Sequence, residues 1–453
     1  MNDPSGAAEI VEAAPSTDGE MNGAHPDSNG AGARHDAHDT PGPAPEYREP
    51  KGSVVQLVAV VAAILAISML THSLDLLIVI VAIIAMVMIH EFGHFATAKW
   101  SHMKVTEYFL GFGPRLWSFR RGETEYGVKA LPLGGYVKIV GMTNTEEVDP
   151  ADEPRTYRQQ PFHNRLMVAL AGSFMHFVMA FVLFWGLLVF VGQQQPTTSV
   201  AGFSPISHGV DPARTAGLHT GDTIVSIDGQ TVTSVTQMEQ IIGRHGGTPL
   251  TIVVDRGNPV RHVTVTVTPA LAAGAAKNSA RIGILIGTTT ARTSPIHALG
   301  TAGVFIGQIT TGTLAALGHT FSPHGLSAFF GQLTNSKAAD AAAKNGTRPE
   351  SIVGAVRTAT QVGQGGGFFD LGEVLVNIII AVGIINLVPM LPLDGGHVLV
   401  AVYERVRSRR GRKYHADVTK LMPVVSAFVL FLIVFVVAAV FLDISHPIAN
   451  PFQ

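Results

Sequence analysis

Residues 76–98 read LLIVIVAIIAMVMIHEFGHFATA and decide the fold class of this 453-residue chain. The stretch is apolar up to its His-Glu-x-x-His segment. It is longer than the about 20 residues that a helix needs to cross a hydrocarbon core about 30 Å thick. It therefore predicts a transmembrane helix.

Four other windows have the same character. Residues 166–192, 374–393 and 422–442 are long enough to span a bilayer, whereas residues 54–70 lie at the lower limit. The chain is 47% hydrophobic and only 14% charged, which is too apolar for an ordinary soluble enzyme of this length. We expect a polytopic α-helical membrane protein with four to five spans, of which 51–75 would be the extra one.

Composition excludes several kinds of site. The chain has no cysteine, so it has no disulfide framework, thiolate metal site or cysteine nucleophile, and any metal must be held by histidines and carboxylates. The net charge of -2 gives no argument for a nucleic-acid partner, and we expect none. Residues 1–50 contain almost no large aliphatic residue and are expected to form a disordered tail.

Basic residues gather in two connections, 99–138 and 405–413, and such clusters mark cytoplasmic loops. We therefore expect the tail and both connections in the cytoplasm, and residues 193–372 and the C-terminus outside. A basic run is also typical of nucleic-acid binding, but beside two spans it more commonly contacts anionic lipid. The lipid bilayer is thus the expected partner of these loops.

The segment His90-Glu91-Phe92-Gly93-His94 lies inside the first quoted stretch. On a helix, residues i and i+4 lie on one face, so both imidazoles can reach one metal ion, and Glu91 can address a water on that ion. Two imidazoles and a carboxylate are costly to bury in a membrane and are rarely kept there without a function. The motif predicts metal-assisted hydrolysis.

A third ligand is expected from another apolar segment, because catalytic zinc sites combine three protein ligands with one open position. The window 374–393 is followed by Asp394-Gly-Gly-His397, and the topology puts Asp394 at the depth of His90 and His94. Two alternatives stay open: an Asp-Gly turn or helix cap without a metal, and ligation by His397. Two prolines just before Asp394 are expected to break the helix there.

Four motifs together resemble the site-2 intramembrane metalloproteases, specifically their PDZ-containing bacterial branch. They are His90-Glu-Phe-Gly-His94, Gly111-Phe-Gly-Pro114, Leu131-Pro-Leu-Gly-Gly-Tyr136, and Asn386-Leu-Val-Pro with Leu393-Asp394-Gly-Gly-His397. The resemblance runs from about residue 76 to the C-terminus. It implies zinc bound by His90, His94 and Asp394, with Glu91 as general base.

The resemblance also implies how a substrate is bound. Asn386 is expected near the substrate strand. Residues 111–140 are expected to form β structure dipping toward the active site, where Gly134 and Gly135 meet an unwound substrate helix added as a strand. The expected substrates are single-span membrane proteins, such as anti-sigma factors or remnant signal peptides. The expected location is a bacterial inner (cytoplasmic) membrane, crossed several times.

The sequence departs from the family in the third span. The family usually has Gly, Pro, two residues and Asn there, whereas this chain has Gly172-Ser173-Phe-Met-His176. His176 either replaces the Asn as a hydrogen-bond donor to the substrate backbone or bonds to a neighbouring helix. Ligation of the metal by His176 is a further alternative.

The external segment contains a second module. Residues 216–229 read AGLHTGDTIVSIDG, followed by a helical stretch at 235–242 and strands at 250–255 and 263–267. This pattern resembles a bacterial PDZ domain, which we place at 193–290 as an inserted α+β domain. It either binds an extended peptide along a sheet edge or screens bulky substrates from the membrane site. We favour screening slightly, because a membrane-embedded site already concentrates its substrates.

The expected domain order is a catalytic membrane region at 76–192 and 373–453, interrupted by the PDZ domain and by external linker or surface helices at 291–372. Two functions from other classes compete with a protease. A transporter also places ionisable groups in spans, but it does not need the His-Glu-x-x-His order. A non-catalytic PDZ scaffold leaves the buried histidines and carboxylates without a role.

Overall fold

A computed structural model describes residues 74–142, 146–206, 211–271, 279–345, 348–408 and 414–447, together with single positions between 55 and 69. The predicted tail at 1–50 and most of the predicted extra span at 51–75 lie outside the described residues.

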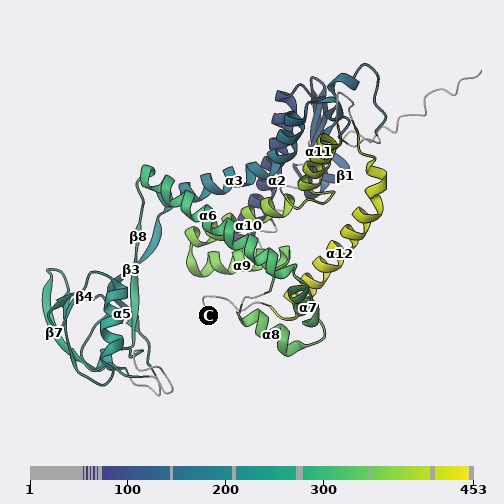
Figure 1. Cartoon of the computed structure of the whole chain (residues 1–453). Helices are drawn as coiled ribbons and strands as arrows, with labels where there is room; N and C mark the ends of the chain where they lie inside the picture. Colours follow the sequence, from purple (N-terminus) through teal and green to yellow (C-terminus); the bar gives the residue numbers. More distant parts are fainter. Residues whose placement is uncertain are drawn as a thin grey trace, which may run out of the picture. The chain divides into compact units, whose positions relative to one another are not determined.

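Four of the described helices are long and apolar enough to cross a membrane. They are α2 (Leu74–Trp100), α3 (Phe162–Gly186, continued by the π-helical turn η3, Leu187–Val191), α10 (Phe368–Asn386) and α12 (Met422–Ser445). Each lies on one of the longer apolar windows, which α10 covers only in part, and Figure 1 shows α2, α3 and α10 close together. Side chains of α3 and α10 such as Phe184, Val376 and Ile380 share one buried core.

The helix α10 ends earlier than its apolar window indicates. The window 374–393 predicts a span to residue 393, but α10 ends at Asn386. Pro389 and Pro392 follow, and proline lacks the N–H group that a continuing helix requires. A new helix, α11 (Asp394–Arg407), then begins directly at Asp394. Asp394 is therefore the first residue of a new helix and not the last residue of the span.

The connection between α2 and α3 forms the β structure expected at 111–140. Strands β1 (Val105–Arg121) and β2 (Thr124–Ile139) are antiparallel. Both strands fold back, because residues 107–110 pair with 135–138 on one side and with 125–128 on the other. The short turns η1 (Glu153–Arg155) and η2 (Tyr157–Gln159) lead into α3, and η4 (Val418–Leu421) leads into α12.

A β domain (residues 193–291) follows α3. Its elements are β3 (Gln193–Phe203), α4 (Pro212–Thr215), β4 (Thr223–Ile227), β5 (Gln230–Thr231), α5 (Val235–Arg244), β6 (Leu250–Arg256), β7 (Arg261–Val267) and β8 (Ile284–Ala291). The sheet order is β7-β6-β4-β3-β8, with β5 paired to β4. Alternating apolar side chains such as Ile224, Ile252 and Val254 fill its core. The positions of α5, β6 and β7 agree with the helix and strands expected from the sequence.

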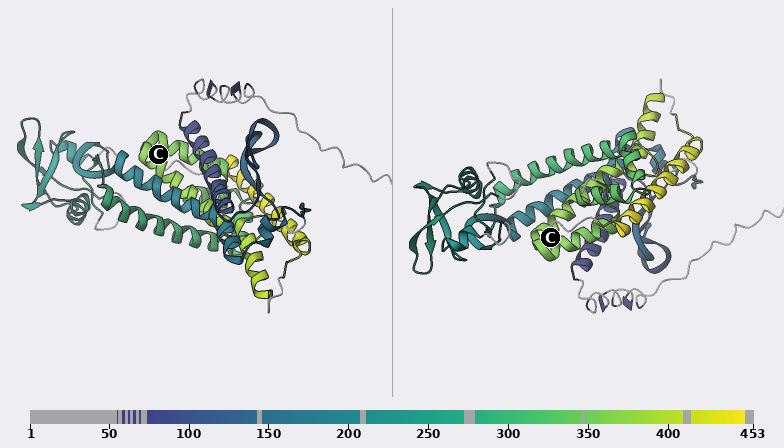
Figure 2. Two further views of the ribbon diagram at one scale, coloured as in Figure 1. Left: turned by 90° about the horizontal axis from the view of Figure 1, so that it is seen from above. Right: turned by 90° about the horizontal axis from the view of Figure 1, so that it is seen from below.

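Four helices occupy the region between the β domain and α10: α6 (Pro295–Thr320), α7 (Pro323–Gly331), α8 (Ser336–Asn345) and α9 (Ile352–Gly366). Both views in Figure 2 show α6 alongside α3. The Phe305 ring stacks on the Phe184 ring with their centroids 3.9 Å apart, and Ala298 and Ala302 lie in the core shared with α3 and α10. At least α6 is therefore packed on the membrane helices.

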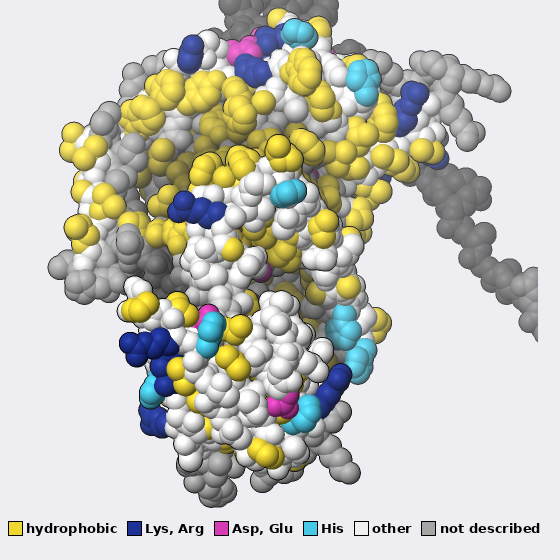
Figure 3. All heavy atoms as spheres, turned by 90° about the vertical axis from the view of Figure 1, so that its left-hand side faces the viewer, with side chains coloured by type: hydrophobic (Ala, Val, Ile, Leu, Met, Phe, Trp, Pro, Cys, Tyr) yellow, Lys and Arg dark blue, Asp and Glu magenta, His cyan; other side chains and the backbone are white. Residues whose placement is uncertain are grey.

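Hydrophobic side chains are also abundant on the surface of the helices. In Figure 3 they crowd the helical part of the face, whereas charged and histidine side chains are frequent over the β domain. On α12, Leu430, Ile433 and Val437 are 62%, 55% and 62% exposed. Apolar surface of this extent is typical of contact with lipid or with a partner.

Candidate metal centre

His90 and His94 stand one turn apart on α2, and their side chains point to the same place. Their Nε2 atoms are 3.2 Å apart, and their rings meet edge to face with centroids 4.9 Å apart. Both residues are buried, at 9% and 6% exposure. The i, i+4 spacing thus presents two imidazole nitrogens on one side of the helix.

Asp394 reaches this pair from α11. Its Oδ1 atom lies 3.3 Å from His94 Nε2, and its Oδ2 atom lies 3.5 Å from His90 Nε2. Ligand atoms of all three residues lie within 4.8 Å of one another. A tetrahedral zinc ion with bonds of about 2.0–2.1 Å separates its ligand atoms by about 3.3–3.4 Å. Separations of 3.2, 3.3 and 3.5 Å therefore fit a zinc ion between the three residues.

The hydrogen bond of His94 Nδ1 determines the tautomer of the His94 ring. Nδ1 lies 2.8 Å from the Val168 carbonyl oxygen on α3, and only a protonated Nδ1 can donate to a carbonyl. Nε2 therefore keeps a lone pair directed toward His90 and Asp394. Histidines that bind metals are commonly oriented by such a hydrogen bond from their second nitrogen.

Glycines allow α2 and α3 to approach closely beside the histidines. A Cβ atom on Gly172 would lie 2.3 Å from His94 Nε2 and 2.7 Å from His90 Nε2. A Cβ atom on Gly93 would lie 2.6 Å from the Ala171 carbonyl oxygen. Interiors are too closely packed to absorb such overlaps, so glycine at position 172 keeps the space beside the two nitrogens open.

Glu91 faces β2. The Val137 backbone on β2 lies beside the Glu91 carboxylate, and a Cβ atom on Gly135 would lie 3.1 Å from the Glu91 Cγ atom. On β1, burial raises the pKa of Tyr108 to about 12, and its hydroxyl donates to the Met88 carbonyl oxygen at 2.8 Å. The hairpin is thus docked on the helix segment that carries the His-Glu-x-x-His motif.

His176 lies next to the metal centre but outside the group of three. It is 1% exposed, and its ring centroid lies 5.0 Å from that of His90. A Cβ atom on Gly383 of α10 would lie 2.7 Å from the His176 Cβ atom, so His176 packs closely against that helix. The side chain therefore bridges the centre and the neighbouring helix.

The other predicted site residues lie outside the group of three. Asn386 is the last residue of α10 and is half-buried. Gly134 has a φ of +149° beside the Phe112 ring, in the part of β2 next to Gly135. Within the described residues, His397 is not part of the group of three, although it shares α11 with Asp394.

Comparison with known proteins decides the family. The model of peptidase family M50 matches residues 78–433, which include all three residues of the group. The chain belongs to peptidase family M50. The zinc metalloproteases Rip1 of Mycobacterium bovis and Mycolicibacterium smegmatis are 33% and 32% identical over 392 and 395 residues, each match covering 80% of this chain and 95% of the relative. A putative zinc metalloprotease of Clostridium acetobutylicum is 25% identical over 363 residues.

One solved structure is similar to a part of this chain. The PDZ domain of an SdrC-like protein from Listeria monocytogenes covers 20% of this chain and 87% of its own at 23% identity, with a TM-score of 0.16.

Membership of family M50, the site-2 protease family, makes the chain a zinc-dependent metalloendopeptidase of the intramembrane type. The resemblance seen in the sequence motifs is thereby confirmed. The competing interpretations, a transporter or a non-catalytic scaffold, find no support in these relatives.

The sequence of this M50 peptidase does not reveal three contributions of α3 to the centre. Gly172 provides space, the Val168 carbonyl orients His94, and the Ser173 Oγ atom lies 3.4 Å from Asp394 Oδ2. The small pair Gly172-Ser173 within an apolar span is the available signal. A backbone carbonyl gives none, because every residue has one.

Proposed function

We propose that His90, His94 and Asp394 bind the catalytic zinc ion and that Glu91 is the general base for peptide-bond hydrolysis. The observation that carries this proposal is the convergence of two Nε2 atoms and a carboxylate at 3.2–3.5 Å from one another. The Val168 carbonyl supports it, because it leaves His94 Nε2 unprotonated.

The chemistry follows from the positions of these residues. When bound, zinc polarises a scissile carbonyl and lowers the pKa of a coordinated water. Glu91 takes a proton from the water and returns it to the leaving nitrogen. The Glu91 carboxylate faces the β2 side, where the Val137 backbone and Gly135 lie beside it. Burial of both histidines limits the access of bulk water.

We place the substrate along β2, with Gly134 and Gly135 as its contacts. Within the described residues, 135–138 pair on one side with 107–110, so an unwound substrate segment can add to the other side. Gly135 lies next to Glu91, which brings an added strand to the centre. Asn386 and His176 serve as hydrogen-bond donors to the substrate backbone in this arrangement.

The substrates we propose are single-span membrane proteins, such as anti-sigma factors or remnant signal peptides, cut in or beside their transmembrane segments. From the basic connections 99–138 and 405–413 we infer that the centre lies toward the cytoplasmic side of a bacterial inner membrane, with the β domain outside. The four candidate spans support a multi-pass location.

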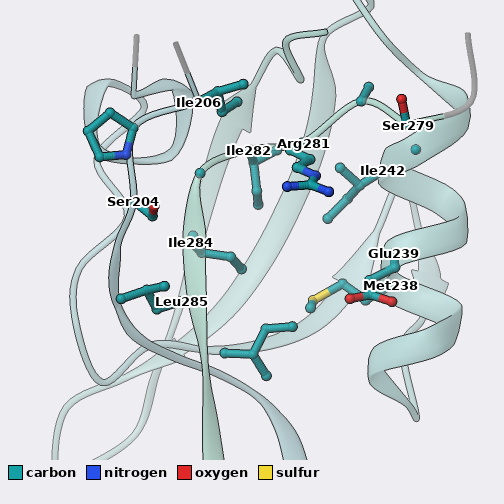
Figure 4. A pocket seen from close by; sticks show the side chains of 15 residues that line it. Ser204, Ile206, Met238, Glu239, Ile242, Ser279, Arg281, Ile282, Ile284 and Leu285 are labelled. Atoms are coloured by element: carbon teal, nitrogen blue, oxygen red, sulfur yellow. The ribbon is translucent and has the colours of Figure 1, made fainter. Parts of the chain in front are cut away.

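A cavity of about 630 Å³ favours peptide binding as a second function, that of the β domain. Figure 4 shows Met238 and Ile242 of α5 facing Ile282 and Ile284 across it. β8 ends the sheet order, so within the described structure its outer edge is open to an extended peptide. A pure size filter, which the sequence slightly favours, needs no such groove.

The test is cleavage of a labelled single-span protein by the purified full-length chain in detergent, with and without a chelator. We expect cleavage to stop on chelation, to return when zinc is added, and to map to the transmembrane segment or its border. Cleavage that continues in the chelator would contradict the proposal.

A further inference from the structure

A buried ion pair joins α3 to α11 away from the three proposed ligands. The Arg165 Nη2 atom lies 2.6 Å from the Glu404 Oε2 atom, and the two side chains are 9% and 2% exposed. A charge buried to this extent is costly unless its partner is held in good geometry. Neither Arg165 nor Glu404 belongs to the group His90, His94 and Asp394.

Further contacts hold both partners in place. The Arg165 guanidinium lies 5.1 Å from the Tyr157 ring centroid, and the Tyr157 hydroxyl donates to the Arg165 carbonyl oxygen at 3.1 Å. The Glu404 Oε1 atom accepts a hydrogen bond from the Ala416 N–H group at 2.7 Å. The pair is thus fixed by chain segments before α3 and after α11.

Polar groups of α11 contact α3 toward both ends of α11. Near the metal centre, the Ser173 Oγ atom lies 3.4 Å from Asp394 Oδ2; at the other end is the pair Arg165–Glu404. The contacts are eight positions apart on α3 and ten on α11, or about 12 Å and 15 Å at a rise of 1.5 Å per residue. These similar spacings let both contacts form at once.

Asp394 is the first residue of α11, so its position follows that of the helix. It follows residues 387–393, which are not helical, so the rigid helix α10 does not fix its position. A slip of α11 by one residue would move the carboxylate by about 1.5 Å. Such a slip would break its separations of 3.3 and 3.5 Å from the two histidines.

We propose that Arg165 and Glu404 are positioning residues, which set the register of α11 on α3 and thereby hold Asp394 at the zinc site. This inference rests on the ligand role proposed for Asp394. Neither Arg165 nor Glu404 touches the metal or the substrate; they act through the helix that carries the ligand.

The test measures the zinc dissociation constant of the purified full-length chain in detergent, by competition with a chelator, together with its unfolding midpoint. Glu404→Gln keeps the shape of the side chain and removes its charge. We expect it to weaken zinc binding by about 10- to 100-fold, the usual effect of losing a contact that orients a ligand. If Glu404→Gln does not fold, Arg165→Lys, which keeps the buried charge but loses the guanidinium fork, serves the same comparison.

A matched control is a second buried pair, Arg348–Asp443. Its Nη2 and Oδ1 atoms are 2.9 Å apart, its side chains are 0% and 4% exposed, and it joins α12 to the segment before α9. Asp443→Asn should lower the unfolding midpoint and leave the zinc constant unchanged. Equal weakening of zinc binding by Asp443→Asn, or wild-type affinity in the Glu404→Gln protein, would overturn the positioning role.

Asp394→Ala, measured in the same assay, separates this inference from the proposed ligand set. Wild-type zinc affinity in Asp394→Ala would remove Asp394 from the ligands. Loss of zinc in Asp394→Ala, with wild-type affinity in Glu404→Gln, would reject the positioning role alone.

Discussion

Gly172 contributes to the metal centre by having no side chain. A Cβ atom there would lie 2.3 Å from His94 Nε2, whereas on Gly186, in the same helix, the nearest atom would be 3.9 Å away. We predict that Gly172→Ala abolishes zinc binding and cleavage while Gly186→Ala retains both, although each change raises helix propensity by about 1 kcal/mol. Metal analysis and cleavage assays of the two variants check this. Full zinc content in Gly172→Ala would show that α3 can move away.

The role proposed for Glu91 can be tested separately from the roles of the proposed metal ligands. Glu91→Gln keeps the size of the side chain, but the amide cannot accept a proton from water. We predict a loss of cleavage by about 10²- to 10⁴-fold, the usual contribution of a general base, with zinc content unchanged. Single-turnover cleavage beside metal analysis measures both. Wild-type turnover would exclude Glu91 from the role.

These residues differ in how far the sequence predicts them. His90, Glu91 and His94 form a local motif, whose i, i+4 geometry follows from the helix itself. The position of Asp394 was inferred from matching depth in the membrane, and the structure places it 3.3 Å from His94. The function of Gly172 could not be read from the sequence, because it depends on how closely α3 approaches α2.

At the scale of elements, Glu123 ties the turn between β1 and β2 to the end of α2. Arg155 donates two hydrogen bonds of 2.8 Å to its carboxylate, and Lys99 donates one of 2.6 Å. The hydrogen bonds from Arg155 and then Lys99 lower the pKa of Glu123 to about 2 from 4.5. A carboxylate with a lowered pKa stabilises the folded state above its unfolded pKa, and this contribution is lost as the pH falls toward the folded pKa.

We therefore predict that Glu123→Gln lowers the unfolding midpoint at pH 6, and that its difference from wild type disappears between pH 4.5 and pH 2. Thermal unfolding of both proteins across this range is the measurement. A difference that stays constant with pH would mean that the ion pairs of Glu123 contribute nothing to stability, as is common for partly exposed pairs.

The elements themselves were largely predictable, because apolar windows and alternating strands are local patterns. The break before Asp394 was predictable too, because Pro389 and Pro392 cannot continue a helix; the apolar window alone overestimates α10, which ends at Asn386. The packing of α6 on α3 was missed. Its sequence has no acidic residue, lysine or arginine and is rich in glycine and threonine, and its place is shown by tertiary contacts such as that of Phe305 with Phe184.

At the scale of the whole molecule, the β domain and the membrane helices have separate cores. Most of the β domain can therefore be deleted to test what it contributes. If the cavity lined by Met238 and Ile242 of α5 and by Ile284 of β8 binds peptides, deletion of residues 200–270 should raise the apparent Michaelis constant for short substrates. If the domain is a size filter, the deletion should instead release cleavage of substrates that keep a large external domain. One substrate with and without its external domain distinguishes these results.

The candidate metal centre brings Asp394 to His90 and His94, which lie 300 or more positions earlier in the chain. The most direct test of this centre is the zinc content of the purified chain and of its His90→Ala, His94→Ala and Asp394→Ala variants. We predict about one zinc ion per chain in the wild type, as in other three-ligand catalytic sites, and loss of the ion in each variant. Full zinc content in any of the three variants would contradict the proposed ligand set.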